Sequence, residues 1–113
     1  MKMELRSLIC SDADIENLVV PDGQAFRFYV EAEIGVLGED GADLFGFTIC
    51  NSEWLRANST DFMPLHTFFL MNEFDFKLLW QSLLEFLARF EGDNWEDLCG
   101  ALSRFTIWEF EGL

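Results

Sequence analysis

The chain has 113 residues, with 7 lysines and arginines against 21 aspartates and glutamates, so its formal net charge at pH 7 is −14. Proteins bind nucleic acids and anionic membranes through basic patches, so this negative charge argues against both as direct partners. If the chain has a partner, the charge favours a basic protein in that role. Half of the residues are hydrophobic and 16% are aromatic. This composition argues against disorder and predicts one domain over residues 1–113.

The cysteines and the N-terminal residues bear on the compartment. The three cysteines, at positions 10, 50 and 99, form no CxxC pair and are odd in number, which predicts reduced thiols in a cytoplasmic protein. The first ten residues, MKMELRSLIC, carry a glutamate and lead into no long apolar stretch, so we expect no signal peptide. No apolar run approaches the ~18 residues of a membrane-spanning helix.

Alternating apolar and polar residues predict a sheet in the first half of the chain. Residues 2–9 form a first candidate strand, and residues 24–35 are the clearest, with one apolar and one charged face. The glycine-rich residues 35–43 predict a turn, and residues 43–50 predict the returning strand of a hairpin. Ser52 is expected to cap a short helical turn. Residues 65–73 predict a third long strand, apolar on both faces and therefore covered.

Two helices are expected in the second half. Apolar residues recur at steps of three and four between positions 75 and 91, which predicts an amphipathic helix that Gly92 ends. Asp93 and Asn94 are expected to cap a second helix that buries Trp95 and Leu98. Residues 105–110, FTIWEF, predict an edge strand or a docked tail. This order predicts an α+β fold with a single, mostly antiparallel sheet packed against two C-terminal helices.

The residues offer little for catalysis or metal binding. His66 is the only histidine, and the pattern places it within the 65–73 strand, where a structural role is favoured over a Cys–His pair. Residues 12–23 begin like a calcium loop, with Asp12, Asp14 and Glu16. However, asparagine stands at the sixth position and glycine at the twelfth, where such a loop needs glycine and a bidentate glutamate. We therefore predict no catalytic residue, no metal ligand and no cofactor.

The acidic residues cluster along the chain. The first candidate surface for a partner is the predicted hairpin, which carries Glu31, Glu33, Glu39, Asp40 and Asp43 with no lysine or arginine among them. The second is the C-terminal pair Trp108 and Glu109, followed by Glu111. A third set lies where the two helices meet: Glu91, Asp93, Glu96 and Asp97. Such clusters steer a basic partner, but solubility and burial of Trp108 in the core explain the same residues without a partner.

The order of motifs resembles a known family, Imm8, of bacterial immunity proteins from polymorphic toxin and contact-dependent growth inhibition systems. The motifs are AEIG at 32–35, LFGFTICNSEWL at 44–55, GDNWE at 92–96 and LSRFTIWEFE at 102–111. The resemblance covers residues 24–111, and its strongest pieces are Trp54-Leu55 after a strand and the closing WEF. The family pattern often ends Trp-Glu-Phe-x-Asp-Tyr, whereas this chain ends Glu-Gly-Leu.

The resemblance implies a small cytoplasmic α+β protein without enzymatic activity that binds and blocks a toxin domain. Many such toxins are nucleases and hence basic, which suits the charge of −14. Three other hypotheses stay open. The chain could be an acidic adaptor or DNA mimic that captures a basic host protein, a small enzyme using His66 and a cysteine, or a calcium-binding protein.

Overall fold

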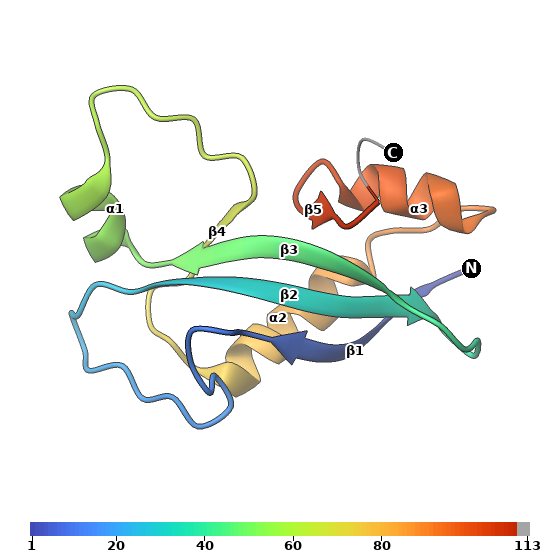
Figure 1. Cartoon of the computed structure of the whole chain (residues 1–113), viewed down its shortest axis with the longest axis horizontal. Helices are drawn as coiled ribbons and strands as arrows, with labels where there is room; N and C mark the ends of the chain where they lie inside the picture. Colours follow the sequence, from blue (N-terminus) through green and yellow to red (C-terminus); the bar gives the residue numbers. More distant parts are fainter. Residues whose placement is uncertain (111–113) are drawn as a thin grey trace.

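Five strands form one mixed sheet in the computed structural model, which describes residues 1–110 (Figure 1). The elements in chain order are β1 (Met3–Ile9), β2 (Arg27–Val36), β3 (Asp43–Cys50), α1 (Ser52–Asn58), β4 (Phe68–Leu70), α2 (Phe76–Leu87), α3 (Trp95–Leu102) and β5 (Ile107–Trp108). Strands β1, β2 and β3 pair antiparallel in that order. The other edge of β3 is shared by β4, which runs parallel, and β5, which runs antiparallel. The predicted α+β class is confirmed.

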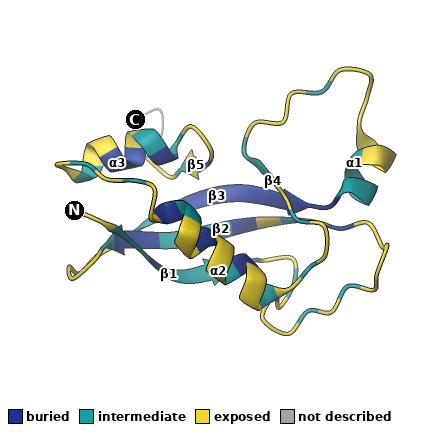
Figure 2. Ribbon diagram, turned by 180° about the vertical axis from the view of Figure 1, so that it is seen from behind, coloured by how far each residue is buried: buried dark blue, intermediate teal, exposed yellow. Residues whose placement is uncertain are grey.

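The core lies on one face of this sheet. Val30 pairs with Phe47 and Ala32 pairs with Phe45, and all four side chains are buried on the same face. Helix α2 crosses that face (Figure 2), and its buried residues are Leu79, Leu83 and Leu87. The three- and four-residue spacing of these leucines is the pattern that predicted the helix. Helix α3 adds Leu98, Cys99 and Leu102 to the buried residues.

The predicted third long strand was wrong in length. Only Phe68–Leu70 pair with β3, and Leu70 is 59% exposed instead of covered. Thr67, just before β4, has a φ of 65°, so the backbone is not extended there. At the other end β3 stops at Cys50, whose carbonyl accepts the last bond, from the Met71 amide. Only three residues of β4 can therefore pair with β3, because β5 pairs with the earlier part of the same edge.

The helix ends also differ from the predictions in two places. Asn51 caps α1 in place of Ser52: its side-chain oxygen accepts from the amides of Trp54 at 3.0 Å and Phe26 at 3.1 Å. Helix α2 ends at Leu87, before Gly92, because the amide of Phe90 turns back to the Leu87 carbonyl. The predicted cap of α3 by Asn94 is confirmed, with its side chain accepting from the Asp97 amide at 2.9 Å. Within residues 1–110, no helix combines the length and hydrophobicity needed to cross a bilayer.

Candidate functional site on the uncovered side of the sheet

The acids predicted on the hairpin separate into three places in the structure. Glu31 and Glu33 pair with Gly46 and Leu44 and lie on the face opposite the core. Glu39 and Asp40 are exposed in the turn between β2 and β3. Asp43 pairs with the buried Ile34, so it lies on the core side. Two of the five predicted residues therefore share one surface, although all five are close in sequence.

The surface opposite the core is here called the open face, and Figure 1 looks onto it with α2 behind the sheet. The register places its residues in two rows across the strands. One row runs Ile9, Glu31, Gly46, Ile107, and the next runs Ser7, Glu33, Leu44. Glu109 continues the second row, since its amide donates to the Leu44 carbonyl at 3.0 Å and its carboxylate accepts from the Leu44 amide at 2.9 Å.

Tyr29 fills the centre of the open face. A Cβ atom at Gly46 would collide with the Tyr29 hydroxyl and the ring carbon that bears it, so the ring lies over this glycine. Burial raises the pKa of the Tyr29 hydroxyl, and the negative charge of Glu31 raises it further. The phenol therefore stays neutral at physiological pH and can donate a hydrogen bond next to a carboxylate.

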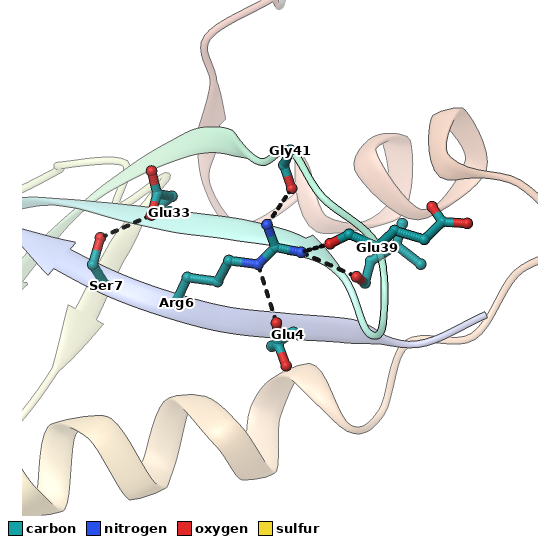
Figure 3. A network of polar contacts seen from close by, with 7 residues as sticks. Glu4, Arg6, Ser7, Glu33, Glu39 and Gly41 are labelled. Atoms are coloured by element: carbon teal, nitrogen blue, oxygen red, sulfur yellow. Dashed lines mark hydrogen bonds and ion pairs between the residues drawn. The ribbon is translucent and has the colours of Figure 1, made fainter.

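Arg6 holds the turn between β2 and β3 in place (Figure 3). Its guanidinium donates to the main-chain carbonyls of Val36, Glu39 and Gly41, and it pairs with the Glu4 carboxylate at 3.1 Å. Arg6 thus binds the backbone of the turn and not the side-chain carboxylates of Glu39 and Asp40. This role was not predicted, because an arginine on one strand gives no signal of binding carbonyls that lie 30 to 35 positions away.

Asp43 joins two tryptophans on the core side. The indole nitrogens of Trp95 and Trp108 both donate to its Oδ2 atom, at 2.9 and 3.0 Å. The Trp108 ring also stacks on Phe45, with centroids 6.4 Å apart and planes at 10°. Trp108 is therefore partly buried and structural in this chain, and it fixes the start of the segment that carries Glu109. Glu111 lies outside the described residues.

The candidate residues for catalysis lie in different surroundings, because Cys50 and Cys99 are buried and His66 is exposed. His66 is exposed in the turn before β4, so its predicted place within a strand was wrong. Burial raises the pKa of the Cys50 thiol, and it raises that of Cys99 to about 12 with help from the charges of Asp43 and Glu96. Within residues 1–110, no three His, Cys, Asp or Glu side chains are grouped to hold a metal.

The two buried cysteines are expected to be inert in the folded protein. At about pH 8, alkylation of Cys50 and Cys99 should be at least about tenfold slower in the native chain than in denaturant, because a protonated, buried thiol is a poor nucleophile. Mass spectrometry of the alkylated peptides measures both rates, and the less buried Cys10 is the internal control. Rapid alkylation of Cys50 or Cys99 in the native chain would contradict this and support a reactive cysteine.

Comparison with known proteins identifies the family. Neither a curated protein nor a solved structure matches the chain. The model of a family described as Immunity protein 8 matches residues 3–112. This match confirms the resemblance found over residues 24–111 and extends it through the first strand. The chain therefore belongs to the Imm8 family of immunity proteins.

Proposed function

We propose that this immunity protein neutralises a basic toxin domain in the cytoplasm by binding it through an acidic surface, without catalysing a reaction. Family membership supports the neutralising role. The observation that supports binding through an acidic surface is that the carboxylates of this surface lack positively charged partners. Within residues 1–110 the one salt bridge joins Arg6 and Glu4. The carboxylates of the candidate surface therefore have no cationic partner in the described chain: Glu31, Glu33, Glu39, Asp40 and Glu109.

Contacts between distant segments support a wider acidic end beside the open face. The Leu37 amide donates to the Lys2 carbonyl at 2.9 Å, and the N-terminal amine donates to the Gly92 carbonyl at 3.1 Å. These bonds bring the hairpin turn and the α2–α3 junction to the same end of the molecule. The junction adds its own acids to those of the turn: Glu91, Asp93, Glu96 and Asp97. Such a concentration of one sign of charge accelerates encounter with a basic protein.

A binding role without catalysis fits the chemistry of the available nucleophiles. The pKa values of Cys50 and Cys99 are raised, which leaves little thiolate at neutral pH. Asp43 and Trp108 contribute to the proposed surface indirectly, because their hydrogen bond helps to hold the Glu109 segment against β3.

The test uses the cognate toxin domain, which is sought first among the genes next to the one that encodes this chain. We expect co-expression to rescue growth from that toxin, and we expect the purified pair to associate far more slowly at about 0.5 M salt than at about 0.05 M, because salt screens the long-range attraction. Stopped-flow association rates at the two salt concentrations measure this. Charge reversal at Glu31, Glu33, Glu39 and Asp40 should also weaken binding.

Two results would contradict the proposal. Absence of both binding and rescue would remove the neutralising role for this toxin. Affinity and association that respond neither to salt nor to charge reversal would remove the acidic surface. Tight, specific binding to a basic host protein, with no effect on the toxin, would favour the acidic adaptor instead.

A further inference from the structure

We propose that the open face of the sheet, and not the tip of the hairpin, is the surface that holds the toxin. Its partner would be a basic segment that places arginine or lysine side chains beside Glu31 and Glu33 and an apolar side chain against Tyr29. This inference rests on the proposed function, because it names the face and the chemistry through which the toxin is bound.

The open face exposes apolar side chains that no helix covers. Ile9 is 47% exposed, Tyr29 36% and Ile107 45%, although all three stand on paired strands. Helix α2 packs on the opposite face, behind the sheet in Figure 1, and no helix lies in front of β1, β2 and β3 in that view. Exposed apolar side chains gathered on one sheet face, with charged residues among them, are typical of a protein interface.

Tyr29 and Gly46 together form a flat centre on the open face. Because Gly46 has no side chain, the Tyr29 ring lies across β3, between Glu31 on its own strand and Ile107 on β5. Tyrosine is enriched among the residues that dominate binding energy, since it offers a large rigid apolar area and a polar hydroxyl. A guanidinium over this ring would also gain a cation–π interaction.

The two central rows of the open face carry negative charge. Glu31 and Glu33 are half-buried and project from the same face, two positions apart. Their carboxylates accept a single hydrogen bond within the described residues, which Ser7 Oγ donates to Glu33 at 3.3 Å. The nearest strand cations are engaged elsewhere. Arg6 holds the turn carbonyls, and Arg27 lies over the Trp54 ring at 5.7 Å. A second copy of this chain would bring like charges together here, whereas a basic segment would neutralise them.

The hairpin tip offers charge without an apolar contact surface. Glu39 and Asp40 are exposed in the turn, and their side chains make no hydrogen bond or ion pair within residues 1–110. Rim charges of this kind change mainly the rate of association, while charges enclosed at the centre of an interface change dissociation. We therefore expect that the same loss of charge mainly speeds dissociation when it is made on the open face, and mainly slows association when it is made at the hairpin tip.

The test compares two double variants that lose the same charge. For Glu31→Gln with Glu33→Gln, we expect the Kd for the cognate toxin to rise about 30-fold or more, mainly through faster dissociation. For the matched control, Glu39→Gln with Asp40→Asn, we expect a rise below about threefold, mainly through slower association. Surface plasmon resonance gives both rate constants, and thermal unfolding verifies that each variant is folded.

A second pair of variants tests the apolar centre. Tyr29→Ala should raise the Kd at least about tenfold, whereas Leu84→Ala, at a similarly exposed position on α2, should leave it unchanged. The inference is overturned if the open-face variants bind like the original chain, or if the hairpin-tip variant loses more affinity than they do. It is also overturned in favour of a second copy if the chain alone sediments as a dimer that Tyr29→Ala dissociates. Failure of the unaltered chain to bind the toxin would instead remove the proposed function.

Discussion

Replacing Phe45 with alanine is expected to lower the free energy of unfolding by about 3–5 kcal/mol. Phe45 lies at 0% exposure on β3, where it pairs with Ala32. Its ring meets Trp95 edge-on at 6.3 Å and stacks against Trp108. Alanine would leave a cavity that these two indoles cannot close, because both are also tied to Asp43. Urea denaturation followed by far-UV circular dichroism measures the loss.

The matched control for this variant is Phe62→Ala. Phe62 is 85% exposed in the loop after α1, so the same deletion of a phenyl ring should change stability by no more than about 0.5 kcal/mol. Tryptophan fluorescence should also change for Phe45→Ala and not for Phe62→Ala, because only Phe45 contacts two indoles. Equal stabilities for the two variants would show that the β3 core is not packed as described.

The elements that could be predicted from the sequence are those in which the spacing of apolar residues follows directly from which side of the element is buried. Residues 43–50 are mostly apolar, which is typical of a strand that is covered on its faces, and β3 spans these same residues. The leucines of α2 repeat with the helical period because one side of the helix meets the sheet. The length of β4 could not be predicted in this way. It depends on where β3 ends and on β5 occupying part of the same edge, and both are properties of the tertiary structure.

In the candidate site, too, some features could be predicted from the sequence and others depend on the tertiary structure. Alternation along β2 predicts that Glu31 and Glu33 share a face, and the register confirms this. The same alternation assigns no partner to Asp43, whose two indole donors come from residues 52 and 65 positions away. Tyr29 was missed because its exposure and its contact with Gly46 arise from strand pairing. A glycine within an apolar strand, as Gly46 is, signals the close approach of another group, but it does not identify Tyr29 as that group.

Asp43→Ala is expected to lower the free energy of unfolding by about 2–4 kcal/mol. The carboxylate accepts two indole N–H groups on one oxygen, and hydrogen bonds to a charged acceptor are stronger than neutral ones. Alanine would leave the Trp95 and Trp108 nitrogens without this acceptor in a partly buried setting. Trp108 would then lose its side-chain hydrogen bond and keep its stacking on Phe45. Thermal and urea unfolding measure the change.

Two further variants separate structure from charge. Asp40→Ala removes the same charge from an exposed turn position, so we expect a change within about 0.5 kcal/mol. Asp43→Asn keeps an oxygen where both indoles donate, so it should recover part of the stability that alanine loses. If Asp43→Ala were no less stable than Asp40→Ala, the indole bonds would contribute nothing. If Asp43→Asn instead kept its stability but lost toxin affinity, Asp43 would belong to the binding surface, as the sequence first predicted.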